Sequence, residues 1–244
     1  MSDDAATPAP RKRRWFRFSL RFLLVLVVIV AVPLAWKVNR VRNQRLVVVE
    51  VEALGGRITL AHESGVLSGR AAEAPGPKWL RKILGDSYFA EVIQIDVRQT
   101  AVSDEVLARF STLTDLKYLV LDANKVTDAG FEQIATLPHL AELALYSDQM
   151  TDTNLRHLQN AAGLIDLCLS GEKITDAGLR HIGKLTQLRC LRLQASMVTD
   201  RGLVELYGMR NLCEMELGDT SVTPEGVERL RKALPKCQIS VTTN

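Results

Sequence analysis

The sequence has little cysteine, proline, glycine or aromatic side chain for its length. Four cysteines among 244 residues exclude a small scaffold held together by disulfides, and eight prolines with fifteen glycines exclude a collagen or a flexible linker protein. Only 5% of the residues are aromatic, so the core must be packed from aliphatic side chains. A hydrophobic share of 47% is enough to bury such a core, which excludes a wholly disordered chain.

Acidic residues are scarce in the first fifty positions. Ten lysines and arginines lie up to Glu50 against three acidic residues, whereas 21 basic residues face 25 acidic ones from Val51 onward. The net charge of +3 therefore belongs to the N-terminal segment. Because the remainder has no basic excess of the kind that attracts nucleic acid, we predict no nucleic-acid partner.

Charge is absent from the fifteen residues Phe22 to Trp36. As a helix this stretch would span about 22 Å, less than a hydrocarbon core of roughly 30 Å. Counted from Phe16 it has 21 residues and reaches about 31 Å, with two arginines near its start that can extend to the headgroups. We predict a transmembrane helix over 16–36 that follows a basic cytoplasmic tail over 1–15.

Two other interpretations of this segment are a cleaved signal peptide and a buried helix of a soluble protein. Cleavage after Ala35 would need a small residue two positions earlier, where Pro33 stands, and this favours an uncleaved anchor. Six basic residues precede Phe22, and four lie just after Trp36, from Lys37 to Arg45. This balance favours a single-pass protein with its N-terminus in the cytoplasm and its larger part outside.

A connecting region is expected over 37–77. A helix that continues from the membrane segment should end at Gly55-Gly56, where a left-handed cap residue is easily formed, and Arg57 to Ala61 should form a short strand before a linker. Residues 78–91 then hold a helix that places Trp79 and three aliphatic residues on one side. We expect this helix to cap the domain that follows.

The domain 92–244 is built from a repeat of 24 residues. Six aliphatic positions recur at that spacing, each followed by Ser or Thr: Val102, Val126, Met150, Ile174, Val198 and Val222. An L-x-x-L-x-L pattern recurs in register with them, as in Leu116/Leu119/Leu121 and Leu140/Leu143/Leu145. Each unit should supply one parallel strand and a return segment, and stacked units should bury a continuous core.

The return segments should be short helices. The Ser or Thr of each repeat fits the N-cap position, and the Asp that follows the threonine at 128, 152, 176 and 200 suits the positive end of the helix dipole. In the last copy Pro224 replaces the Asp, and proline is favoured at the first helical position, so Thr223 is the cap.

The motif T-D-A-G-L, present at Thr175 to Leu179 and nearly repeated at Thr127 to Phe131, resembles the cysteine-containing subfamily of leucine-rich repeats. The resemblance covers about Val92 to Val241, although the usual asparagine after the strand is kept only at Asn124. It implies an α/β leucine-rich repeat solenoid with parallel strands on the concave face and short helices on the convex face, preceded by the N-terminal transmembrane helix.

The N-terminal segment is also similar to that of bacterial membrane-anchored repeat proteins, through Arg14 to Arg21 and Pro77 to Leu80. That similarity implies a bacterial inner membrane, with the repeats outside the cytoplasm. Eukaryotic members of the repeat subfamily often carry an F-box. No F-box-like domain precedes Lys78, so we do not expect a ubiquitin-ligase role.

The sequence contains none of the motifs that we searched for as signs of catalysis or cofactor binding. It has no phosphate loop, dinucleotide fingerprint, nucleophile elbow or H-E-x-x-H pair. His157 and His181 share one repeat position and would lie on neighbouring helices, where they form either a metal site or ordinary exposed surface. Gln133, Glu205 and Arg229 occupy the same position, which favours exposed surface. We predict no enzyme, cofactor or metal.

Cys213 and Cys237 are also 24 residues apart, which places them on adjacent strands. They form either a disulfide in an oxidising compartment or two packed thiols. Cys168 and Cys190 occupy different repeat positions and should stay apart.

Residues that alternate with the leucines should line the concave face, which repeat proteins use for ligands. We expect Glu142 beside Asp166 to form a like-charge pair flanked by Tyr118 and Tyr146, and the partner to be a basic and partly apolar peptide segment. The alternative is a mixed, solvated face in which Arg98 adjoins Asp122 and Arg192 adjoins Glu216. The candidate binding residues are Asp96, Tyr118, Val120, Asp122, Glu142, Tyr146, Asp166, Arg192 and Glu216.

Two functions follow from this organisation. The first is a membrane-tethered module that binds a protein on its concave face. The second is an assembly protein that self-associates through the uncovered edge of the last strand, Gln238 to Val241.

Overall fold

The computed structural model describes residues 20–61, 78–84, 91–194 and 197–242, and the chain forms two compact units, 1–40 and 41–244. In the first unit every described residue lies in helix α1 (Leu20–Ala53), whose last turns belong to the second unit. Helix is thus confirmed from Leu20 onward, while 1–19 lie outside the described residues, the start of the expected span included. Across the four described ranges, no helix is both long and apolar enough to cross a membrane.

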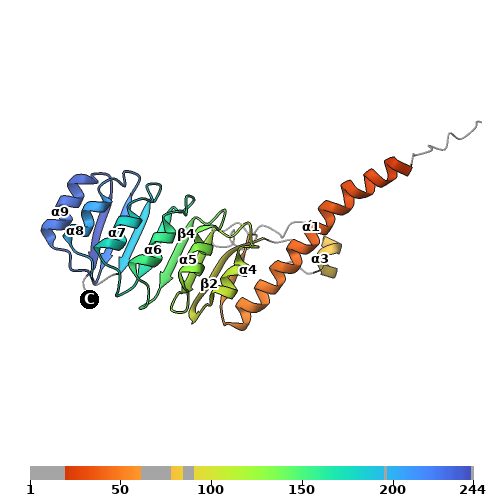
Figure 1. The fold of residues 1–244 in the computed structure, drawn as a ribbon, viewed down its shortest axis with the longest axis horizontal. Helices are drawn as coiled ribbons and strands as arrows, with labels where there is room; N and C mark the ends of the chain where they lie inside the picture. The colour runs from red at the N-terminus through yellow and green to blue at the C-terminus, as the bar shows by residue number, and fades with distance from the viewer. Residues whose placement is uncertain (1–19, 62–77, 85–90, 195–196, 243–244) are drawn as a thin grey trace, which may run out of the picture. The chain divides into compact units, whose positions relative to one another are not determined.

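The second unit contains one eight-stranded sheet whose strands follow one another in sequence order (Figure 1). Strand β1 is antiparallel to β2, and every later pair is parallel. The strands are β1 (Arg57–Leu60), β2 (Val92–Ala101), β3 (Tyr118–Asp122), β4 (Glu142–Tyr146), β5 (Asp166–Ser170), β6 (Cys190–Gln194), β7 (Glu214–Gly218) and β8 (Gln238–Thr242).

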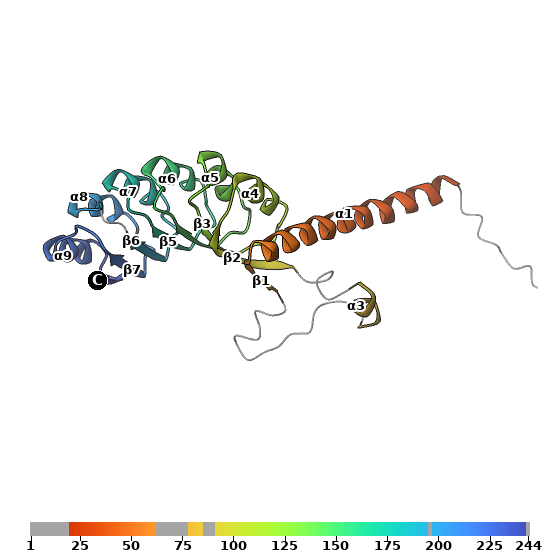
Figure 2. The same cartoon turned by 90° about the horizontal axis from the view of Figure 1, so that it is seen from below.

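A short helix follows each strand from β2 to β7, and these helices all lie on one face of the sheet (Figure 2). They are α4 (Asp104–Phe110), α5 (Asp128–Ala135), α6 (Asp152–Leu158), α7 (Asp176–Ile182), α8 (Asp200–Leu203) with the 3₁₀ turn η2 (Val204–Leu206), and α9 (Pro224–Ala233). The predicted solenoid of parallel strands and short helices is confirmed. We call the sheet face opposite the helices the concave face.

The core lies between the sheet and the helices and is almost wholly aliphatic. The repeating leucines of the strands are at most 2% exposed, and Phe131 and Ile134 of α5 are buried against them. Each such side chain contributes roughly 1.5–3 kcal/mol on burial. Because every strand packs its leucines against those of its neighbours, a single repeat has no core of its own.

The N-terminal end of the sheet is capped by α1 and β1. Val47 and Val51 of α1 are buried in the repeat core. The helix then ends as predicted, since Gly55 has a φ of 72° and the Gly56 amide donates to the Val51 carbonyl at 2.8 Å. We expected the segment 78–91 to provide this cap. Its helix is present as α3 (Lys78–Leu84), in which Trp79 is 66% exposed, while 85–90 lie outside the described residues, so the capping role of this segment stays a prediction.

The C-terminal end of the sheet is strand β8. Ile239 is the one buried residue of this strand, and its carbonyl accepts a hydrogen bond from Arg231 of α9 at 3.1 Å. An unpaired strand edge tends to pair with other chains. The hydrogen bond from the Arg231 guanidinium uses the Ile239 carbonyl, which such pairing with another strand would need.

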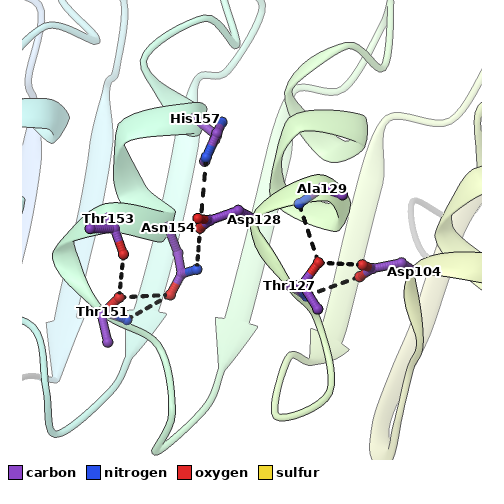
Figure 3. Close-up of polar contacts among 8 residues, drawn as sticks. All are labelled: Asp104, Thr127, Asp128, Ala129, Thr151, Thr153, Asn154 and His157. Carbon is purple, nitrogen blue, oxygen red and sulfur yellow. Dashed lines mark hydrogen bonds and ion pairs between the residues drawn. The ribbon is translucent and has the colours of Figure 1, made fainter.

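Neighbouring helices are joined by a ladder between aspartate and threonine. Asp176 accepts hydrogen bonds from the Thr199 amide at 2.8 Å and from its hydroxyl at 2.7 Å, while the Thr199 hydroxyl caps α8 by accepting from Arg201 N. The same joint links Asp104 to Thr127 (Figure 3), Asp152 to Thr175 and Asp200 to Thr223. The aspartates therefore bind the next repeat as well as beginning their own helix.

This joint explains the glycine of the T-D-A-G motif. A Cβ atom on Gly202 would collide with the Asp176 carboxylate, and Gly130, Gly178 and Gly226 face Asp104, Asp152 and Asp200 in the same way. Without a side chain at this position, the preceding aspartate can reach the threonine amide.

One repeat has Asn154 in place of the glycine, and its joint is rebuilt (Figure 3). The Asn154 side-chain oxygen Oδ1 accepts from the Thr151 backbone amide at 2.8 Å, and its side-chain Nδ2 donates to the Asp128 carboxylate at 2.8 Å. The Asn154 side chain thus accepts the hydrogen bond from the threonine amide that an aspartate accepts in the other repeats. Asp128 is joined to this repeat through Asn154 and not through the threonine.

Candidate binding face

The concave face is lined by the residues that alternate with the buried leucines. Across β3 to β7 they form three columns of neighbours in register: Tyr118, Glu142, Asp166, Cys190 and Glu214; Val120, Ala144, Cys168, Arg192 and Glu216; Asp122, Tyr146, Ser170, Gln194 and Gly218. Most of these side chains are half-buried or exposed, whereas the leucines between them are buried. The predicted orientation of the strands is confirmed.

Glu142 and Asp166 are neighbours in the first column and line a shallow hollow of about 160 Å³ together with Tyr118, Cys168 and Arg192. Burial raises the pKa of Glu142, and the negative charge of Asp166 raises it further. The like-charge pair expected from the sequence is therefore present, and the ionised form of Glu142 would be favoured by an added cation.

Arg192 contacts Asp166, with guanidinium nitrogens 3.2 and 3.4 Å from the carboxylate oxygens. Arg192 and Glu216 are neighbours in register, as in the alternative interpretation of a mixed, solvated face. The Arg192 side chain, however, extends diagonally from β6 to β5 and forms its ion pair with Asp166. The contact offsets the charge of Asp166 only in part, since Asp166 still raises the pKa of Glu142, and it leaves Glu216 with no ion pair in the described part of the chain.

Arg98 pairs within its own strand, two residues away, and not with Asp122, its neighbour in the alternative interpretation. Its guanidinium lies 2.7 Å from the Asp96 carboxylate, and this hydrogen bond lowers the pKa of Asp96. The register between β2 and β3 shifts after Val97, so that Asp122 lies opposite Ala101. The Asp122 carboxylate accepts a hydrogen bond from the Asn124 backbone amide at 2.8 Å.

The face is left with a surplus of negative charge. Across β2 to β7 its two arginines both form internal pairs, whereas Glu142, Glu214 and Glu216 form no ion pair among the residues that the structure describes. Glu214 was not among our predicted site residues. Glu214 lies in the same column as Glu142 and Asp166, and this shared repeat position could have identified it as a site residue from the sequence.

Tyrosines lie on two sides of the acidic residues. Tyr118 is beside Glu142 in the first column, and Tyr146 lies beside Cys168 in the middle of the face. Burial raises the pKa values of both Tyr146 and Cys168, so both stay neutral at physiological pH. Together with Val120 and Ala144 they give the centre of the face an apolar surface.

The convex histidines are not the exposed pair that we expected. The His157 side chain is 19% exposed, with Nε2 3.7 Å from the Asp128 carboxylate, and burial lowers the pKa of His181. Both carry a ring nitrogen that is buried without a hydrogen-bond partner. Within the described ranges, no group of three or more His, Cys, Asp or Glu residues is arranged to hold a metal ion.

All four cysteines are free thiols in the structure, including Cys213 and Cys237. Cys190 is buried and Cys168 half-buried, and their places in different columns agree with the sequence analysis.

The 24-residue units, each with a parallel strand and in most cases a short helix, make this chain a leucine-rich repeat solenoid. It matches no protein-family model and no curated protein. Among solved structures it is similar to a leucine-rich repeat protein of Leptospira interrogans, with 23% identity and a TM-score of 0.44 over 61% of this chain and 36% of that one. The chain thus spans about a third of the length of the Leptospira protein.

It is also similar to two internalins of Listeria monocytogenes. The match to internalin C2 has 18% identity and a TM-score of 0.42, covering 65% of this chain and 86% of that one. The match to internalin F has 18% identity and a TM-score of 0.34, covering 60% and 54%.

Proposed function

We propose that this chain is a protein-binding module whose concave face takes a basic, partly apolar segment of another protein. Leucine-rich repeat solenoids are generally non-catalytic and present such faces to ligands. The observation that carries the proposal is the set of carboxylates without ion pairs, Glu142, Glu214 and Glu216, beside the apolar centre of the face.

The charge of the face favours a cationic partner over an anionic one. A lysine or arginine beside Glu142 would relieve the repulsion from Asp166 and favour the ionised form of the carboxylate. The tyrosines supply contact area at a small cost in conformational entropy and keep a hydroxyl for hydrogen bonds. A segment that alternates basic and apolar side chains matches both features.

The test is titration of a labelled peptide of alternating lysine and valine against the purified protein at low salt. Reversing two charges on the face, Glu142→Lys with Glu216→Lys, should weaken binding about tenfold, or about 1.4 kcal/mol. The matched control reverses two exposed carboxylates of the convex helices, Glu132→Lys with Glu225→Lys. Equal weakening by both double variants would show that the net charge of the protein, and not this face, attracts the peptide.

Salt and a peptide of opposite charge provide a second check. Binding should weaken as ionic strength rises, because exposed charges about 10 Å apart are largely screened near 0.1 M salt. The peptide with glutamate in place of lysine should not bind. Binding of both peptides with equal affinity would refute recognition by charge.

We further propose that the apolar segment 16–36 tethers the module to a membrane, with the repeats outside the cytoplasm. The support comes from the sequence, which has no charge from Phe22 to Trp36 and a basic excess before it. In the structure Val25, Val28 and Ile29 of this segment are more than half exposed, as lipid-facing side chains would be. Extraction of cell membranes with alkaline carbonate should leave the protein in the pellet, and release into the supernatant would refute the tether.

The orientation is tested separately by adding protease to intact cells whose outer barrier has been opened. Loss of the repeat domain with survival of a cytoplasmic marker is expected. Protection of the repeats until the inner membrane is broken would place them in the cytoplasm.

A further inference from the structure

Cys213 and Cys237 are held side by side at the start of the last two strands. Strands β7 and β8 are parallel and in register from Glu214 and Gln238 onward, and each cysteine directly precedes one of these residues. The Gln238 amide donates to the Cys213 carbonyl at 2.8 Å, so the two backbones are hydrogen-bonded at this point. Neighbouring strands lie about 5 Å apart, which is within the Cα separation of disulfide-bonded cysteines.

The two thiols differ in environment. Cys213 is exposed, and its sulfur donates to the Asn211 carbonyl at 3.3 Å. Cys237 is half-buried, and burial followed by the proximity of Cys213 raises its pKa to about 11. An oxidant from solution therefore meets Cys213 first, and Cys237 is the neighbouring thiol that reacts next.

The other two cysteines lack this arrangement. Cys168 and Cys190 are on adjacent strands but in different columns of the concave face, and burial raises the pKa of Cys190 to about 12. They serve as internal controls for any oxidation of the protein.

Strand β8 is also the strand that a crosslink would affect most. Ile239 is its single buried residue, whereas Met215, Leu217 and Gly218 of β7 are all buried. With so little buried surface, β8 should open from the sheet more readily than any internal strand.

We propose that Cys213 and Cys237 form an oxidisable dithiol, and that their intramolecular disulfide fastens β8 to the sheet when the protein meets a hydroperoxide. Cys213 attacks the peroxide as its thiolate, the O–O bond breaks, and the departing hydroxide takes up the thiol proton, so that a sulfenic acid and one water are formed. The Cys237 thiol then attacks the sulfenic sulfur, so that the S–S bond forms and a second water leaves. Two thiols and one hydrogen peroxide give one disulfide and two waters.

The full-length protein is treated with hydrogen peroxide, alkylated and digested with trypsin. The four cysteines fall in four different tryptic peptides, 157–173, 190–192, 211–229 and 237–244, so each is observed separately. The expected product is a crosslinked pair of 211–229 with 237–244 that has lost two hydrogen atoms, with Cys168 and Cys190 alkylated. Sulfinic acid or an intermolecular disulfide at Cys213 with Cys237 still alkylated would overturn the proposal.

Variants and hydrogen exchange complete the test. Cys213→Ser and Cys237→Ser should each abolish the crosslinked peptide, whereas Cys168→Ser should leave its yield unchanged. In the oxidised protein amide exchange over 238–242 should slow roughly tenfold relative to the reduced protein, with no change over β4 and β5. A disulfide that forms without slowing exchange in β8 would overturn the role in fastening the strand.

Discussion

Removal of Asp176 should destabilise the protein far more than removal of Asp128, although both begin a helix directly after a threonine cap. Asp176→Ala deletes two hydrogen bonds to a half-buried carboxylate and leaves the Thr199 amide and hydroxyl without their acceptor. Hydrogen bonds to charged groups contribute about 1.5–3 kcal/mol each, and partial exposure reduces this. We expect a total loss of about 2–3 kcal/mol.

Asp128→Ala should cost less than half as much, about 1 kcal/mol or below. Asp128 is 54% exposed and accepts one hydrogen bond from the Asn154 amide, and the Thr151 amide keeps Asn154 as its acceptor in the variant. Both variants remove the same favourable charge from a helix N-terminus. Their difference therefore compares the direct joint between Asp176 and Thr199 with the joint that runs from Asp128 through Asn154.

The assay is urea unfolding at 25 °C and neutral pH, followed by far-ultraviolet circular dichroism for the two variants and the wild type. A loss of 2–3 kcal/mol should also lower Tm by roughly 5–10 °C in a domain of this size. If the two variants lose the same free energy of unfolding, the aspartates act through the helix dipole, and the ladder of hydrogen bonds between repeats makes no net contribution.

Three further changes test other parts of the structure. Gly226→Ala places a Cβ against the Asp200 carboxylate and should cost more than 1 kcal/mol, whereas Gly208→Ala meets no atom within 4 Å and should be near neutral in the same urea assay. The pKa of Asp200 is lowered from 3.8 by its hydrogen bonds to Thr223, so its contribution to stability is present above pH 3.8 and lost as pH falls through the lowered value. The excess stability of the wild type over Asp200→Ala should accordingly shrink between pH 6 and pH 2, and a constant difference would contradict this. Arg231→Ala frees the Ile239 carbonyl at the edge of β8 and should raise the molar mass measured by light scattering, while an unchanged mass would show that the guanidinium does not guard the edge.

The repeat pattern predicted most of the second unit because each signal is local and recurs. The spacing of 24 residues predicted the parallel strands and their register, and the alternation within L-x-x-L-x-L assigned each side chain to the core or to the concave face. Threonine before Asp or Pro located the starts of the helices, and the hydroxyls of Thr127, Thr175 and Thr223 accept backbone hydrogen bonds there. Backbone preference and hydrophobic period suffice for such predictions.

Side-chain partners were less predictable. The 24-residue spacing placed Arg192 beside Glu216 and Arg98 beside Asp122, yet both arginines form their ion pairs with other residues. An arginine side chain is long and flexible enough to reach several neighbours. For Arg98, the shift of register after Val97 also moves Asp122 away, to a place opposite Ala101. Column positions identify the candidates for an ion pair but do not choose among them.

The sequence by itself determined the repeat, its core and the acidic character of the concave face, because these depend on periodicity and composition along the chain. Only the tertiary structure decided which carboxylates keep their charge unpaired, that the α1 valines cap the first strand, and why glycine follows Asp and Ala in the repeat. Those features depend on contacts between residues 23 or more positions apart, where a distance of one or two ångströms decides whether a hydrogen bond or a collision results.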